Sequence, residues 1–166
     1  LELANKIKLK LFPSDASNLI RNSKELLIKT STKEIIQDSN KNFPESIFIV
    51  GMPRSGSTLV ESILSMNKNV YDLGEINICE EAFFEWNKYK YNLSFEKLYF
   101  EKINQKTSDF IITTNKWLYN YQYAGIISGQ LPNSKIIHCF RNPLDNILSL
   151  YRANFTKGNT YSSSLS

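Results

Sequence analysis

The chain has 166 residues, 42% of them hydrophobic, which is the length of one ordinary domain with enough apolar side chains for one core. Lys and Arg outnumber Asp and Glu by 20 to 16, and the net charge of +4 suits an anionic ligand but is too small to indicate a nucleic-acid partner. Cys79, Cys139 and the single histidine lie in no metal-binding spacing, so we expect no metal site and two reduced core cysteines.

No apolar run approaches the 18 or so residues that a membrane span needs, and the first residues lack the apolar core of a signal peptide. We therefore expect a cytoplasmic protein with no membrane partner. The chain opens without Met and closes on a serine-rich run, so we also expect both ends to be cut and the C-terminal part of the domain to be missing.

Residues 1–43 are rich in Lys and Asn, with apolar clusters at 19–20, 26–28 and 35–36 that recur at helical spacing. This pattern predicts two short helices. Ser17 or Asn18 could cap the first, and Thr32 with Glu34 could open the second. We place an N-terminal helical segment at residues 1–45 and the main domain at residues 46–166.

Three strand-and-helix units follow in the main domain. The first strand is predicted at 47–50 and its helix starts near residue 58, the second strand lies at 110–113 with a helix at 118–130, and the third lies at 135–140. Asn142 and Pro143 have the composition of an N-cap and a first helical position. Alternating strands and helices predict an α/β, three-layer fold with a central parallel sheet flanked by helices, similar to P-loop proteins.

The loop after the first strand has the glycine spacing of a phosphate-binding loop. Its residues are Gly51, Met52, Pro53, Arg54, Ser55, Gly56, Ser57 and Thr58. Backbone N–H groups and a helix N-terminus attract an anion at such a loop. Ser57 stands where a nucleotide triphosphatase has its lysine, and Arg54 supplies a cation instead, which fits a phosphosulfate better than a metal-bound triphosphate. The alternative is a plain glycine turn.

A second anion site is predicted at the end of the third strand. Arg141 ends that strand, and Ser149 lies about 9 Å into the following helix at 1.5 Å per residue, so the two could bind an anion beside the helix. From the residues alone, Arg141 could equally be a surface charge and Ser149 a solvated helix position.

The segment from Ile49 to Leu59 resembles the 5′-phosphosulfate loop of sulfotransferases that use 3′-phosphoadenosine 5′-phosphosulfate (PAPS), especially the tyrosylprotein and tetratricopeptide-linked branch. In that family an arginine after a strand and a serine eight residues later bind the 3′-phosphate, which is the spacing of Arg141 and Ser149. The resemblance covers about residues 47–158. It leaves open whether residues 1–43 end a tetratricopeptide array and whether the protein is a homo-oligomer.

The resemblance also implies the catalytic residues. Glu75, which lies 21 residues beyond Arg54, matches the general base of the tyrosylprotein branch, and Lys116 matches a lysine that reaches the bridging oxygen of the phosphosulfate. Without the resemblance, Glu75 would be a carboxylate in the first turn of a helix. The cytosolic branch uses a histidine as base, but His138 lies inside the third strand and is expected to be a core residue.

The aromatic stretch 83–89, which continues to Phe95 and Tyr99, could line an acceptor channel, although aromatics at helical spacing are usually core. The expected function is transfer of a sulfuryl group from PAPS to an acceptor hydroxyl, with no metal. The acceptor is a peptidyl tyrosine, a carbohydrate or a small molecule. The alternative is a catalytically incompetent domain that binds PAPS or another nucleotide, or that only pairs with another subunit.

Overall fold

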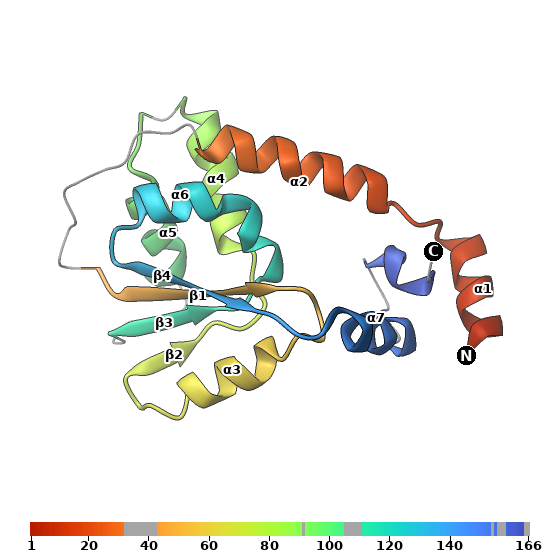
Figure 1. Ribbon diagram of the computed structural model, residues 1–166. Coiled ribbons are helices and arrows are strands. Elements are labelled where there is room, and N and C mark those ends of the chain that lie inside the picture. Colours follow the sequence, from red (N-terminus) through yellow and green to blue (C-terminus); the bar gives the residue numbers. More distant parts are fainter. Residues whose placement is uncertain (32–42, 91, 105–110, 154, 156–158, 165–166) are drawn as a thin grey trace.

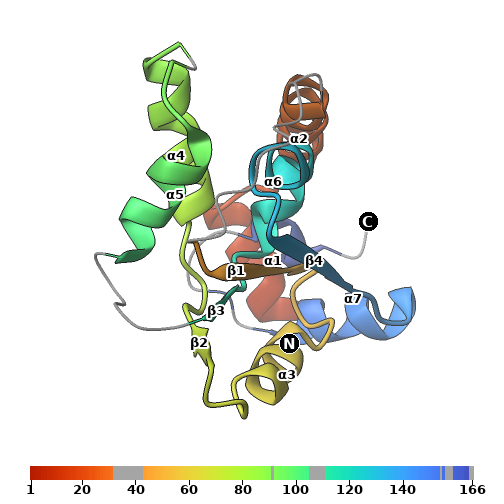
Figure 2. The same ribbon diagram turned by 90° about the vertical axis from the view of Figure 1, so that its left-hand side faces the viewer.

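A computed structural model describes residues 1–31, 43–90, 92–104, 111–153, 155 and 159–164 of the chain. These residues form a parallel sheet with helices on both faces (Figures 1 and 2). The predicted α/β class and the parallel central sheet are therefore confirmed. The predicted helix near Thr32 lies outside the described residues.

The sheet has four parallel strands in the order β2-β3-β1-β4, so the first strand of the chain lies in the middle. The strands are β1 (Glu45–Gly51), β2 (Val70–Asp72), β3 (Ile112–Asn115) and β4 (Ser134–Cys139). Three of them correspond to the three predicted strands. The short strand β2 was not predicted, and it exists by pairing with β3.

Successive side chains of β1 point to opposite faces of the sheet and define two cores. Ile47 and Ile49 pack with Cys139 in a small core on one face, against partly buried side chains of α3 (Ser57–Leu64). Phe48 belongs to the larger core on the other face. The strand is buried on both faces, as strands of parallel sheets are, which explains the continuous apolar run at residues 47–50.

The larger core lies under α4 (Ile78–Lys88), α5 (Phe95–Asn104) and α6 (Ala124–Gln130). Its aromatic side chains pack on one another, and the most buried are Phe48, Phe83, Phe95, Tyr99 and Tyr123. Most of the aromatic stretch that could have lined a channel is therefore core. Burial raises the pKa of the Cys79 thiol in the same core, and both cysteines are free and buried as expected.

The helix predicted over residues 118–130 is divided into a 3₁₀ helix, η1 (Leu118–Tyr123), followed by α6. The side chain of Asn115 accounts for the tight first turn, because its Oδ1 accepts hydrogen bonds from the Trp117 N–H at 3.0 Å and from Asn120 Nδ2 at 2.8 Å. Such bonds compete with the regular helical pattern. The chain therefore turns sharply as it leaves β3.

The N-terminal segment forms α1 (Glu2–Leu11) and α2 (Ala16–Ser31). α1 was not predicted, and α2 begins earlier than expected: Asp15 precedes it, so the proposed caps Ser17 and Asn18 lie inside its first turn. Asp15 Oδ1 accepts a hydrogen bond from Asn18 Nδ2 at 2.5 Å. α2 packs against η1 and α6 on the outer side of the layer that covers the sheet (Figure 1).

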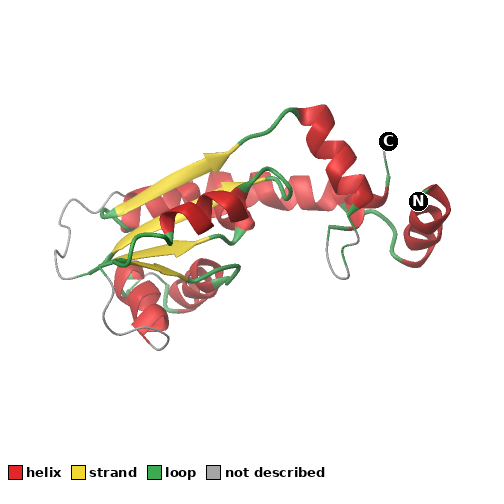
Figure 3. Ribbon diagram, turned by 90° about the horizontal axis from the view of Figure 1, so that it is seen from below, coloured by secondary structure: helices red, strands yellow, loops and turns green. Residues whose placement is uncertain are grey.

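β4 leads into α7 (Pro143–Arg152), which lies beyond the end of the sheet (Figure 3). Asn142 caps this helix as predicted, because its Oδ1 accepts hydrogen bonds from the backbone N–H groups of Leu144 and Asp145. α1 and the short helix η2 (Thr160–Ser163) pack beside α7. Both ends of the described chain thus meet at the helix that carries Ser149.

Candidate functional site

The loop between β1 and α3 has an unusual backbone that glycines make accessible. Gly51 and Gly56 have φ angles of 145° and 99°, and Arg54 adopts a left-handed φ of 69°. A side chain on Gly51 would overlap the carbonyl oxygen of Cys139, so the end of β1 can approach β4 only without a Cβ. A left-handed conformation at a non-glycine residue is uncommon and often occurs where a loop holds a ligand.

This loop and the end of β4 border one cavity of about 430 Å³. The cavity is lined by Arg54, Ser55, Gly56, Ser57, Thr58 and Arg141. Backbone N–H groups at the start of α3 lack helical partners, and two guanidinium groups add positive charge. The hydroxyl of Ser55 is buried and has no hydrogen-bond partner among the described residues. The two strand-to-helix junctions that the sequence singled out therefore face a shared hollow.

Direct hydrogen bonds hold α7 against the loop. Arg54 Nε donates to Ser149 Oγ at 3.2 Å, and Arg141 Nη1 donates to the carbonyl oxygen of Arg54 at 3.3 Å. Asn146, one helical turn before Ser149, donates from Nδ2 to the carbonyl oxygen of Pro53 at 3.0 Å. The structure thus brings Arg54, Arg141 and Ser149 together.

Asn146 was not among the predicted site residues. It is buried although it is polar, and its amide ties the loop to α7. The available signal was its position on the same helix face as Ser149, one turn earlier.

A second cluster contains Glu75 and Lys116. Lys116 Nζ lies 2.6 Å from Glu75 Oε1, and the backbone N–H of Lys116 donates to the carbonyl oxygen of Gly74 at 2.9 Å. Gly74 has a φ of 66°, which turns the chain between β2 and α4. Glu75 stands three residues before α4, so the alternative interpretation as a carboxylate in the first turn of a helix is wrong.

Glu61 completes this cluster, although the sequence did not indicate it. Its Oε2 lies 3.8 Å from Lys116 Nζ, and its Oε1 accepts a hydrogen bond from Thr114 Oγ1 at 3.1 Å. Burial raises the pKa of Glu61, and the charge of Asp72 raises it further, whereas Lys116 and Thr114 oppose the rise. Lys116 and Glu75 do not line the cavity at the loop, but Glu61 lies on the helix whose first residues do.

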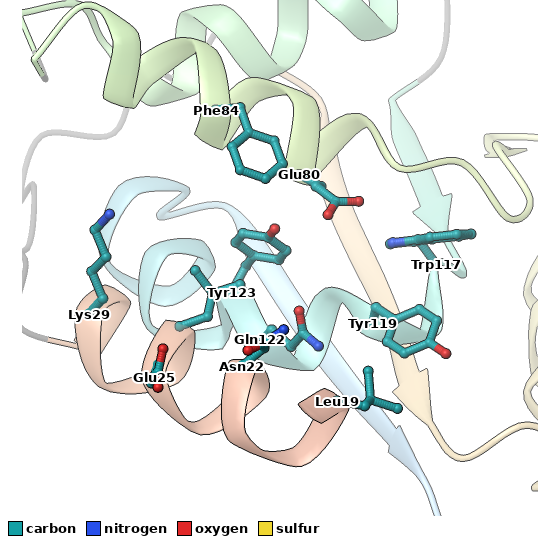
Figure 4. A pocket seen from close by; sticks show the side chains of 11 residues that line it. Leu19, Asn22, Glu25, Lys29, Glu80, Phe84, Trp117, Tyr119, Gln122 and Tyr123 are labelled. Atoms are coloured by element: carbon teal, nitrogen blue, oxygen red, sulfur yellow. The ribbon is translucent and has the colours of Figure 1, made fainter. Parts of the chain in front are cut away.

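Figure 4 shows a larger cavity of about 510 Å³ between α2, α4 and η1. Phe84, a residue that is 61% exposed, faces this space together with Trp117, Tyr119 and Tyr123. Of the aromatic stretch 83–89, Phe84 alone is among the residues that line this cavity. Trp117 directly follows Lys116 in the chain, so the segment that carries Lys116 continues into the wall of this cavity.

His138 is exposed, and the expectation of a core histidine was wrong. β4 is an edge strand, and much of its outer surface is uncovered in the described part of the chain. Among the described residues, no group of three or more His, Cys, Asp and Glu side chains could hold a metal ion. The same residues contain no helix with the length and apolar character that crossing a membrane requires.

Comparison with known proteins relates the chain to one family. The family model described as "Sulfotransferase domain" matches residues 44–163. The match is to the domain as a whole and assigns no branch within it. An uncharacterized protein of Aquifex aeolicus (strain VF5) is 30% identical over 152 residues, covering 77% of this chain. The chain spans about a fifth of the length of that relative, 20%.

Proposed function

The chain belongs to the sulfotransferase domain family, and we propose that it transfers the sulfuryl group of PAPS to an acceptor hydroxyl. The observation that carries this proposal is that Arg54, after β1, and Arg141, after β4, line the same cavity. PAPS carries a phosphosulfate and a 3′-phosphate at opposite ends of one nucleoside, and therefore needs two anion sites on one protein surface. The residues around the hollow fit such a ligand, since they combine two fixed cations with a helix N-terminus.

We assign the two ends of PAPS to the two junctions. Residues Pro53, Arg54, Ser55, Gly56, Ser57 and Thr58 would hold the 5′-phosphosulfate. Arg141 and Ser149 would hold the 3′-phosphate, and Ser149 is already oriented by its hydrogen bond with Arg54. The buried hydroxyl of Ser55 offers a donor that has no partner within the described residues.

Transfer breaks the bond between sulfur and the bridging oxygen of the phosphosulfate and forms a bond between sulfur and the acceptor oxygen. The acceptor proton goes to the Glu75 carboxylate, which is 62% exposed and so within reach of an acceptor. The leaving group is 3′,5′-adenosine bisphosphate. Lys116 and Arg54 would stabilise the negative charge that develops on the bridging oxygen.

The resemblance to the tyrosylprotein and tetratricopeptide-linked branch rests on the loop sequence and on Glu75 as base. The acceptor would approach from the side of Trp117, where the cavity of Figure 4 begins. Peptidyl tyrosine, a carbohydrate and a small molecule are the candidates.

The function is tested by incubating the chain with ³⁵S-labelled PAPS and a panel of tyrosine peptides, sugars and phenols. We expect label to appear on one acceptor class and Glu75→Gln to abolish this transfer, while 3′,5′-adenosine bisphosphate still binds. Glu81→Gln is the matched control, because Glu81 is an exposed carboxylate nearby in the first turn of α4. Full turnover by Glu75→Gln would remove Glu75 as the base.

The alternative function is a domain that binds PAPS or another nucleotide without catalysis. It is favoured by one observation: Glu75 is engaged by Lys116 at 2.6 Å and is not free. Binding of 3′,5′-adenosine bisphosphate without transfer to any acceptor in the panel would support this alternative.

A further inference from the structure

We propose that Glu61 is a positioning residue, which holds the ammonium group of Lys116 in place when Glu75 leaves it to accept the acceptor proton. This inference rests on the proposed function, because only a catalytic Glu75 has to give up its ion pair. Glu61 has no direct role toward the acceptor or PAPS. It would act through Lys116.

The two carboxylates around Lys116 differ in their surroundings. The side chains of Lys116 and Glu61 are each 6% exposed, whereas that of Glu75 is 62% exposed. The shorter contact is made by the exposed partner, at 2.6 Å, and the longer contact by the buried one, at 3.8 Å. Glu75 can therefore turn toward solvent and an acceptor, while Glu61 is confined beside the ammonium.

Two neighbouring elements fix the position of Glu61. Its Oε1 accepts a hydrogen bond from Thr114, a fully buried residue of β3, at 3.1 Å. Its backbone belongs to α3, which begins at Ser57 in the proposed phosphosulfate loop, one helical turn earlier. Glu61 thus connects the helix that would bind the sulfur donor to the lysine that would assist its cleavage.

The energetics explain why a second carboxylate is needed. A buried ammonium that loses its partner is strongly destabilised, because no water replaces the lost charge. If Glu75 were its sole counter-ion, its departure would either strand Lys116 or draw the lysine side chain away from the site. Glu61 prevents both outcomes, since its buried carboxyl group stays beside Lys116 when Glu75 departs. Lys116 and Thr114 in turn favour the charged form of Glu61 against its burial and the nearby charges of Asp72 and Glu75.

The test is the variant Glu61→Gln in the 166-residue chain. Glutamine keeps the length of the side chain and an oxygen that can accept the Thr114 hydrogen bond, and it removes only the charge. We expect kcat for transfer from PAPS to fall about tenfold, the scale of one charge-assisted contact in a transition state. KM for PAPS and Kd for 3′,5′-adenosine bisphosphate should change less than twofold, because the residues at the cavity are untouched.

Two further variants separate positioning from a general effect on folding. Glu96→Gln is the matched control, because Glu96 is also a buried helical carboxylate whose pKa burial raises, but it lies on α5. This control should leave kcat unchanged. Glu61→Asp retains the charge with a shorter side chain and should restore part of the lost kcat.

The inference is overturned if Glu61→Gln retains the wild-type kcat, or if it weakens bisphosphate binding as much as it slows transfer. It is also overturned if Glu96→Gln lowers kcat equally. An inactive wild-type chain would instead refute the proposed function, and the inference with it.

The ion pair between Glu61 and Lys116 can be measured without activity, by thermal unfolding. Glu61→Gln and Lys116→Met together should lower Tm by less than the sum of their separate effects.

Discussion

The assignment of Arg141 to the 3′-phosphate can be tested by a pair of ligands that differ in that group alone. Arg141→Ala removes a guanidinium that lines the cavity and touches the loop through the Arg54 carbonyl oxygen. A hydrogen bond to a charged group contributes about 1.5–3 kcal/mol, and because Arg141 is exposed we take the lower part of this range. About 1.5–2 kcal/mol corresponds to a rise of roughly 10- to 30-fold in Kd.

Isothermal titration calorimetry at 0.15 M salt measures this change. We expect the Kd for 3′,5′-adenosine bisphosphate to rise by that factor in Arg141→Ala, and the Kd for adenosine 5′-phosphate to change little. Arg152→Ala is the matched control, because it removes the same charge from the last turn of α7, the helix that follows Arg141. It should leave both constants near the wild-type values.

Comparing the two ligands also separates a lost contact from a loosened loop. If Arg141 merely supports the loop, both nucleotides will bind more weakly by the same factor in Arg141→Ala. That result, or equal losses in Arg152→Ala, would refute the assignment of the 3′-phosphate to Arg141.

Three further predictions concern stability. Gly51→Ala should lower the free energy of unfolding by roughly 2–6 kcal/mol, because a Cβ there would meet the Cys139 carbonyl oxygen and the φ of 145° is strained for alanine. Gly56→Ala, at a φ of 99° with open space around it, should cost less, about 1–3 kcal/mol, and urea unfolding that ranks them in reverse order would contradict this account. Asn142→Ala should lower the stability by about 1 kcal/mol through loss of the α7 cap, and an unchanged Tm would show that the cap contributes nothing. Because the pKa of Glu61 is raised, the folded state binds the Glu61 proton more tightly than the unfolded state does. The contribution of this carboxyl group to the free energy of unfolding therefore falls as pH rises above 4.5. The stability of Glu61→Gln relative to wild type should therefore increase with pH from 4.5 upward in denaturant titrations, and a difference that is constant with pH would contradict the shift.

Local patterns in the sequence were sufficient for much of the fold. The apolar run of β1 predicted a buried strand, and the polar and apolar pattern after the following loop predicted the helix α3. Asn142 and Pro143 identified the start of α7 because capping depends on neighbouring residues alone. These features are encoded within a few residues of where they occur.

Features that depend on distant partners were missed. β2 has three residues, too few to show a period, and is held by its pairing with β3. The apolar residues Leu3, Ile7 and Leu11 of α1 recur at helical spacing but are exposed. The helix is held by hydrogen bonds from Asn5 to the Tyr151 carbonyl oxygen and from Lys8 to that of Phe155. A contact between segments so far apart leaves no local signal.

In the candidate site, too, residues with a local sequence signal were predicted and residues that depend on distant partners were not. Arg54, Arg141 and Ser149 were identifiable from motif spacing, and the structure brings them together. Glu61 was missed, because a glutamate on a helix ordinarily faces solvent and its buried partner, Lys116, is remote in the sequence. His138 was misjudged, because burial of a strand depends on what covers it and not on its own residues.

The packing of α2 has a practical consequence for expressing this protein. Ser23 and Tyr121 share a hydrogen bond of 2.9 Å, and the hydroxyl of Thr30 donates to the carbonyl oxygen of Gln122 at 3.2 Å. A recombinant fragment trimmed to the family-matched range 44–163 would delete these contacts and open one wall of the cavity in Figure 4. Cloning boundaries drawn from similarity would thus cut through a packed layer, and low solubility of such a fragment would say nothing about the chain that includes α1 and α2.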